Sequence, residues 1–95
     1  MTLDTRTFDL PPIMKIEDCQ NLHGFLQQSG GTPVILECAS VTRLGGLAAQ
    51  LIKIAATIWA AQGVPFKLVA PSPGFRDSLR ALGLDDLLTE KEGVA

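Results

Sequence analysis

Aromatic and basic residues are scarce in this chain of 95 residues. It has no tyrosine, and aromatic side chains make up only 5% of the total, so it lacks the stacking platforms that bind single-stranded nucleic acids. Its formal net charge is −2 and its pI about 5.1, whereas nucleic acids and anionic membranes attract clustered positive charge. We therefore expect no nucleic-acid partner and no binding to anionic lipid.

Residues that bind metals are equally few. The two cysteines, Cys19 and Cys38, are far apart in the sequence and cannot complete a zinc site with the single histidine, His23. We interpret both cysteines as buried, reduced thiols and expect neither a metal nor another cofactor. For His23, a phosphorelay role is the alternative to an ordinary position on a helix surface, and the surface position is the more common one.

Patterns typical of catalysis are missing as well. No Ser, His and Asp, and no Cys and His, have the spacing of a nucleophilic site, and Asp85 and Asp86 are adjacent rather than paired across a pocket. Glu37, near the end of a predicted strand, is better explained as a solvated or hydrogen-bonded carboxylate than as a catalytic one. We therefore expect that the protein is not an enzyme.

The chain has no segment typical of secretion or of a membrane span. Its start, MTLDTRTFDL, has no basic region followed by an apolar core. The most apolar stretch, residues 44–61, has Gln50, Lys53 and Thr57 at helical spacing, which predicts an amphipathic helix rather than a transmembrane one. These patterns predict a cytoplasmic protein without direct insertion into a membrane.

What the chain does have is enough apolar sequence for one small core. Hydrophobic residues make up 46% of it, which is typical of a single globular domain. We expect one domain over residues 1–95, with its core at about 5–88 and a flexible tail at 89–95. Strands are predicted at residues 5–10, 34–38 and 66–70, with a weak one at 13–15, and helices at 16–28, 47–63 and 73–82. This alternation predicts an α/β (α+β-like) fold, in which helices pack on a mixed sheet.

Several local signals support these elements. Strand 34–38 is almost wholly apolar, which is typical of a central strand covered on both faces. Ser72 is a good N-cap with Pro73 in the first helical turn, and Gly83 is expected to end that helix, with Leu84 folding back on it. Two helix faces are predicted to be buried: Ile16, Cys19, Leu22 and Leu26 in the first helix, and Phe75, Leu79 and Leu82 in the last.

The helix predicted at residues 47–63 has an apolar arc wider than a core requires. At about 100° per residue, the set expected to face the sheet is Leu47, Leu51, Ile54, Ala55 and Ile58. A second set extends the apolar surface around the helix: Ala48, Ala49, Ile52, Ala56, Trp59 and Ala60. This second set either packs inside the domain, with Trp59 filling a gap beside another helix, or meets a partner, with Trp59 as the anchor.

The order of these elements, together with several short motifs, resembles a known family. The motif residues are Leu36-Glu37, Val41-Thr42-Arg43-Leu44, Leu51, Gly63, Leu68-Val69, Pro71-Ser72-Pro73, Leu79 and Leu82-Gly83-Leu84. In this order and spacing, over roughly residues 8–88, they resemble the STAS domain of sulfate transporters and anti-sigma factor antagonists. The resemblance implies the STAS fold, with a mixed sheet of four to five strands and helices packed on it.

The turn before the long helix departs from the family pattern. In members that phosphorylation switches, this turn reads Asp-Ser or Asp-Thr, and a partner kinase phosphorylates the hydroxyl group. Gly45 and Gly46 align with those two positions here, so no phosphorylation is expected at the usual site, Gly46. Ser40 and Thr42 are nearby hydroxyls, which we expect to hydrogen-bond backbone groups of the turn rather than to be phosphorylated.

The resemblance implies a protein–protein interaction module that binds its partner through this turn and the helix after it. The expected partner-binding residues are Arg43, Gly45, Gly46, Gln50, Lys53, Ala56 and Trp59. The expected partner is a histidine kinase or anti-sigma kinase of bacterial signal transduction, as for anti-sigma factor antagonists and the accessory proteins of chemotaxis kinases. The missing hydroxyl favours a constitutive adaptor, and a homodimer is also open.

Two other functions are compatible with the sequence. Stand-alone STAS proteins also resemble a subunit that sits against the ATPase of a bacterial ABC-type lipid transporter, and that role would use the same helix surface. Alternatively, the domain senses a nucleotide or phosphate at Gly45-Gly46. Backbone N–H groups and the positive end of the helix dipole would favour an anion there.

Overall fold

Strands and helices alternate along the chain as the sequence predicts. The computed structural model describes residues 5–88, so the flexible tail expected at 89–95 lies outside the described residues. The elements are β1 (Arg6–Asp9), α1 (Ile16–Gln28), β2 (Val34–Glu37), α2 (Gly46–Gln62), β3 (Phe66–Val69) and α3 (Pro73–Ala81). Each of their predicted boundaries is confirmed to within one residue, because proline, glycine and the Ser72 N-cap mark most of the element ends in the sequence.

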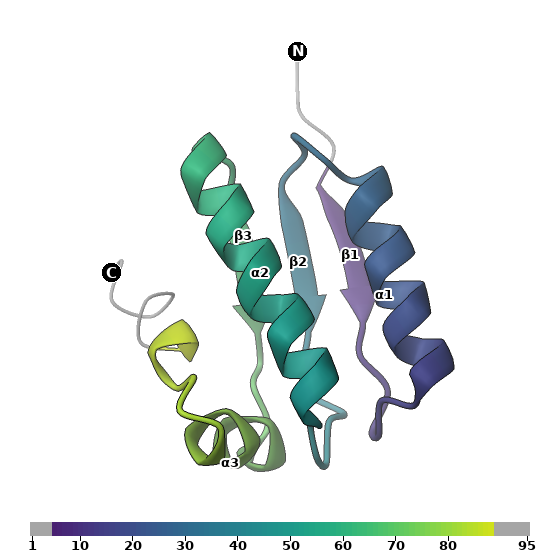
Figure 1. Ribbon diagram of the computed structural model, residues 1–95, viewed down its shortest axis with the longest axis vertical. Helices are drawn as coiled ribbons and strands as arrows, with labels where there is room; N and C mark the ends of the chain where they lie inside the picture. The colour runs from purple at the N-terminus through teal and green to yellow at the C-terminus, as the bar shows by residue number, and fades with distance from the viewer. Residues whose placement is uncertain (1–4, 89–95) are drawn as a thin grey trace.

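The sheet is parallel and has the strand order β1-β2-β3 (Figure 1). Val34 of β2 is in register with Arg6 of β1 and with Phe66 of β3. Within residues 5–88 the sheet is thus neither mixed nor four- to five-stranded, because a helix joins each strand to the next and returns the chain in the same direction. The weak strand predicted at 13–15 forms only an isolated bridge between Ile13 and Arg43.

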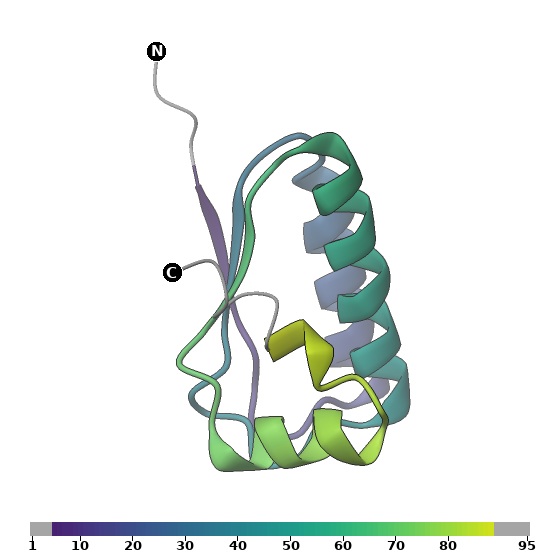
Figure 2. The same ribbon diagram turned by 90° about the vertical axis from the view of Figure 1, so that its left-hand side faces the viewer.

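Helices α1 and α2 lie side by side on one face of the sheet, and α3 lies across the end at which the strands finish (Figures 1 and 2). The strand residues that face α1 and α2 are buried, namely Val34, Leu36, Phe66 and Leu68. Their neighbours along the strands keep partial or full exposure: Ile35, Glu37, Lys67 and Val69. Helices of the described chain therefore cover β2 on one face, and the expectation of two covered faces is wrong.

The orientation of α2 reverses the one expected from its sequence. Its buried residues are Ala48, Ala49, Ile52, Ala55, Ala56 and Trp59. Of the set predicted to face the sheet, Ala55 does so and Leu51 is half-buried, but Leu47, Ile54 and Ile58 have exposed fractions of 59%, 54% and 45%. The alanines face the sheet because small side chains let the helix backbone approach the large residues that the strands supply.

The faces predicted for α1 and α3 are confirmed except at the helix ends. Three buried residues of α1 and two of α3 agree with the prediction: Cys19, Leu22, Leu26, Phe75 and Leu79. Ile16 and Leu82 are exposed, because they are the first residue of α1 and the C-cap of α3. Gly83 has the left-handed φ of 74°, and the N–H of Leu84 donates to the carbonyl of Leu79 at 2.8 Å, as predicted for this helix end.

Candidate protein-interaction surfaces

Three connecting segments meet where the parallel strands end, which is the usual place for binding sites in open α/β sheets. The segment after β1 lies beside the turn after β2. The backbone N–H of Thr42 donates to the carbonyl of Pro12 at 2.9 Å, and its Oγ1 donates to the same oxygen at 3.0 Å. The Thr42 hydroxyl thus bonds to the backbone, as expected, although its acceptor belongs to a segment 30 residues away.

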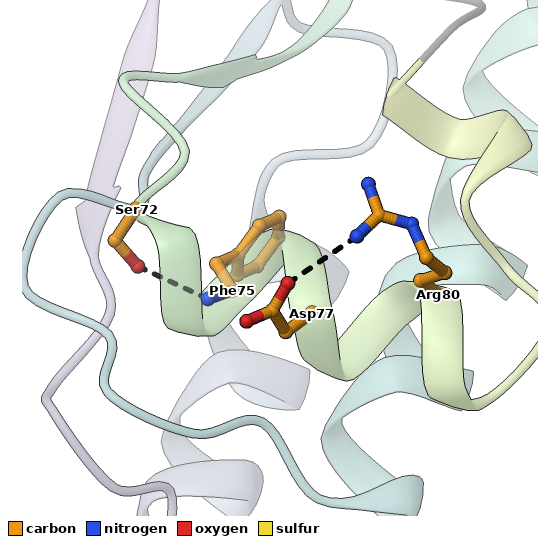
Figure 3. A network of polar contacts seen from close by, with 4 residues as sticks. All are labelled: Ser72, Phe75, Asp77 and Arg80. Atoms are coloured by element: carbon orange, nitrogen blue, oxygen red, sulfur yellow. Dashed lines mark hydrogen bonds and ion pairs between the residues drawn. The ribbon is translucent and has the colours of Figure 1, made fainter.

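Helix α3 holds the same turn from the other side. The hydroxyl of Ser72 donates to the carbonyl of Val41 and accepts from the N–H of Phe75 at 3.1 Å, which confirms the predicted N-cap (Figure 3). Ser78 Oγ accepts from the N–H of Leu44 at 2.9 Å. Together these bonds fix residues 41–44 against the first turns of α3.

The approach of α3 to this turn requires glycine at position 74. A Cβ atom on Gly74 would lie 2.1 Å from the carbonyl oxygen of Thr42, which is too close for any side chain. At Gly45 and Gly46, by contrast, an added Cβ would meet no atom within 4 Å. Gly45 and Gly46 therefore leave open space in front of α2, and Gly45 caps that helix without a side-chain hydrogen bond.

Four of the predicted partner-binding residues gather at this end of the molecule. Arg43, Gly45, Gly46 and Gln50 are all exposed, on the turn and the first turn of α2. Lys53 lies one turn further along α2 and is half-buried, with its Nζ 4.0 Å from Asp86 Oδ2. These residues occupy one continuous side of the turn and helix.

Two predicted partner-binding residues are not on the surface. Ala56 and Trp59 have exposed fractions of 7% and 4%. The indole Nε1 of Trp59 donates to the carbonyl of Thr32 at 2.8 Å, and its ring centroid lies 5.8 Å from that of Phe66. Trp59 therefore packs inside the domain, as the alternative interpretation held, because the burial of the alanine face turns it toward β3.

Exposed apolar residues border the turn. A shallow cavity of about 470 Å³ lies between the turn and α3, and its lining includes Arg43, Gly46, Asp77 and Leu82. Across this cavity from the turn, the carboxylate of Asp77 is 3.3 Å from the Arg80 guanidinium (Figure 3). A second cavity, of about 350 Å³, brings Ile13 beside Arg43 and Gly45. We name six exposed residues of this region the loop-end surface: Ile13, Arg43, Gly45, Gly46, Gln50 and Leu82.

A second apolar surface runs between α1 and α2. Cavities of about 260 and 370 Å³ follow this line, and both include His23 and Leu51 in their lining. We name it the helix groove. Its α2 wall is Leu47, Leu51, Ile54 and Ile58, and its α1 wall is Ile16, Gln20, His23 and Gln27. The sequence did not predict this groove, although large residues at 47, 51, 54 and 58 beside a stripe of alanines could have indicated it.

The remaining candidates from the sequence have unremarkable surroundings. Both cysteines are buried, as predicted, and burial is the main cause that raises the pKa of Cys38 to about 12, with the negative charge of Glu37 adding to it. Burial and the charge of Asp18 likewise raise the pKa of Cys19. In the described part of the chain, no three His, Cys, Asp or Glu residues stand close enough to bind a metal. No helix there is long and apolar enough to cross a bilayer.

Comparison with known proteins agrees with the resemblance seen in the sequence. The fold is that of a small α/β domain in which helices pack on a sheet. The family model of the STAS domain matches residues 15–95, which is well over half of the chain, and the chain belongs to this family. No curated protein and no solved structure matches the chain.

Proposed function

We propose that this protein is a non-enzymatic adaptor that regulates a bacterial signalling kinase in the cytoplasm by binding it through the loop-end surface. Membership of the STAS family indicates a protein-interaction role of the anti-sigma antagonist type. The observation that carries the finer proposal is the loop-end surface itself. In this surface Arg43 lines one cavity with the exposed Ile13 and another with the exposed Leu82, beside Gly45 and Gly46.

The rigidity of this surface supports tight binding. Hydrogen bonds from Thr42 to Pro12 and from Leu44 to Ser78 hold the turn from two sides before any partner arrives. A surface that is already ordered loses little conformational entropy on binding, so more of the contact energy appears as affinity. An arginine beside apolar side chains is also a common composition for the residues that dominate an interface.

The glycines support constitutive binding. Gly45 and Gly46 have no hydroxyl group, so a kinase bound here cannot release itself by phosphorylating this position. In a switchable member the phosphate would add negative charge at the N-terminus of the helix and change the surface that the partner contacts. Here the surface stays the same, and the amount of adaptor sets the extent of binding.

Affinity capture from the native cell, followed by mass spectrometry, tests the proposal. We expect the unaltered protein to recover a histidine or anti-sigma kinase, and Arg43→Glu to lose it by at least about tenfold, the cost of one strong interface contact. Lys67→Glu is the matched control, because it reverses an exposed charge on the uncovered face of the sheet. Equal recovery of the kinase with all three baits would contradict binding through the loop-end surface.

The same capture experiment distinguishes the kinase proposal from the transport alternative. A subunit that sits against the ATPase of an ABC-type lipid transporter would use the same helix and turn. Recovery of such an ATPase in place of a kinase, with the same loss for Arg43→Glu, would move the protein to the transport class.

A second candidate function is sensing of a nucleotide or phosphate at the start of α2. The observation in its favour is that Gly45 provides no side-chain cap, so N–H groups of the first helical turn have no partner from that residue. A thermal-shift series with inorganic phosphate and a panel of nucleotides tests it. Binding would stabilise the fold by about 2.7 kcal/mol at a hundredfold excess over Kd. An unchanged Tm across the panel would exclude this candidate.

A further inference from the structure

The helix groove exposes four large apolar side chains to solvent. Leu47, Ile54 and Ile58 of its α2 wall and Ile16 at one end of its α1 wall are all exposed. Together with half-buried Leu51 they form a continuous strip along the outer side of the two helices. A contiguous patch of large apolar residues on a soluble domain is typical of a contact with another protein surface.

The spacing within the groove identifies what kind of surface fits it. The α2 wall has large residues at positions 47, 51, 54 and 58, with steps of four, three and four. This is the spacing with which helices pack side chains between those of a second helix. It spans about 16 Å at 1.5 Å per residue, which is enough for three turns of a partner helix.

The same spacing reads identically in both directions. Steps of four, three and four are symmetric about a midpoint between Leu51 and Ile54. If a second copy of α2 lies antiparallel to the first, Leu47 stands opposite Ile58 of that copy, and Leu51 stands opposite its Ile54. A two-fold axis through the midpoint therefore pairs large apolar residues along the whole wall, as an isologous dimer interface requires.

The charge around the groove also suits a second copy. A two-fold axis brings a surface against a copy of itself, so a rim with charges of one sign would repel the same rim of the second copy. Among the described residues that line the groove there is no Asp, Glu, Lys or Arg, and its α1 wall has the uncharged Gln20 and Gln27. Lys53 of α2 is not among the lining residues, and its ammonium group is 4.0 Å from the carboxylate of Asp86.

We propose that this protein forms a homodimer in which the helix grooves of two copies meet about a two-fold axis, with the two α2 helices antiparallel. The contact is separate from the loop-end surface, whose residues lie at the end of the strands and on the polar side of α2. Each dimer would thus carry two copies of the loop-end surface, one on each protomer, and a partner with paired subunits could engage both.

The first test is the mass of the protein in solution. Sedimentation equilibrium over a concentration series is expected to give twice the chain mass of 10.1 kDa, falling to 10.1 kDa for Ile54→Glu, which places a charge next to the axis. Thr57→Glu is the matched control, because it adds the same charge to an exposed position of the same helix outside the groove. It is expected to remain dimeric, and circular dichroism checks that both variants keep the fold.

The result that overturns the proposal is a mass of 10.1 kDa for the unaltered protein at every concentration. That outcome would assign the groove to a different occupant, such as a helix of the partner. A dimer that Ile54→Glu leaves intact would also overturn it, since the contact would then lie elsewhere. Neither outcome affects the kinase proposal, which the loss of capture by Arg43→Glu tests on its own.

The second test distinguishes the two directions in which the helices could run. Single-cysteine variants Leu47→Cys and Ile58→Cys are mixed and oxidised mildly. In the antiparallel dimer the mixture forms a cross-linked pair between the two different variants, while neither variant cross-links with itself. Self-cross-linking of each variant alone, without mixed pairs, would mean that the helices are parallel and would overturn the arrangement. The native Cys19 and Cys38 are buried, and unaltered protein gives the background.

Discussion

Helix α2 has two apolar faces that differ in the size of their side chains. The face toward the sheet has four alanines, with Ile52 and Trp59. The α2 wall of the helix groove has only leucines and isoleucines, namely Leu47, Leu51, Ile54 and Ile58. The small residues of the helix are thus mostly buried, while four of its large aliphatic residues are exposed or half-buried. The comparison teaches that size alone does not decide burial in this domain, and that the aliphatic residues left outside form a second surface rather than part of the core.

The largest expected difference in stability is between two variants that each place a glutamate on one face of α2. Ala56→Glu would bury an unpaired carboxylate against the sheet, and such changes are among the few that cost about 4 kcal/mol or more, so we expect most of the stability to be lost. Position 54 is exposed to solvent when the chain is a monomer, so Ile54→Glu should then change the free energy of unfolding by no more than about 0.5 kcal/mol. Urea denaturation of both variants at low protein concentration measures the difference.

This pair of variants also tests the placement of α2 directly. If Ala56→Glu folds normally and Ile54→Glu unfolds, the helix is turned the other way, and the face first expected from the sequence is the buried one. The loop-end surface would then continue onto Ala56 and Trp59.

A smaller effect is expected when an isoleucine is shortened on each face. Ile52 is completely buried, so Ile52→Ala should cost about 2–5 kcal/mol through lost burial and the cavity that it leaves. Ile58→Ala removes the same atoms from a half-exposed position and should cost less than about 1 kcal/mol. Thermal unfolding monitored by circular dichroism compares them, and equal losses would mean that the groove is covered in the isolated chain.

The smallest expected loss of stability comes from removing the indole N–H of Trp59, the polar side-chain group on the buried face of α2. Trp59→Phe removes the N–H that donates to the carbonyl of Thr32 but keeps an aromatic ring beside Phe66. We expect a loss of about 1–2 kcal/mol, because the acceptor is only half-buried and water can replace part of the bond. Urea denaturation gives the value. In the unaltered protein, the fluorescence of this sole tryptophan should shift to longer wavelength on unfolding. A spectrum that is the same in the folded and unfolded states would contradict its burial.

Much of the candidate site could be located from the sequence, but its exact members could not. Arg43 and the glycines after it are predicted to bind a partner, and the structure exposes them in the turn between β2 and α2. Ile13 and Leu82 could not be assigned to the same surface, since they are far from this turn in the sequence. They reach it because the segments after β1 and β3 end at one edge of a parallel sheet, where Pro12 and Ser72 bond to the turn between them.

The sequence alone determined the positions and ends of the elements. Local forces set them: proline and glycine stop a strand or helix, Ser72 satisfies the N–H of Phe75, and apolar periodicity distinguishes strand from helix. Only the tertiary structure decided which face of α2 is buried. Because apolar residues cover most of the circumference of α2, its sequence alone does not select the face that is buried. The choice depends on the residues opposite it, because the alanines let the helix approach the large side chains of β2 and β3, and Ile52 and Trp59 are buried on the same face.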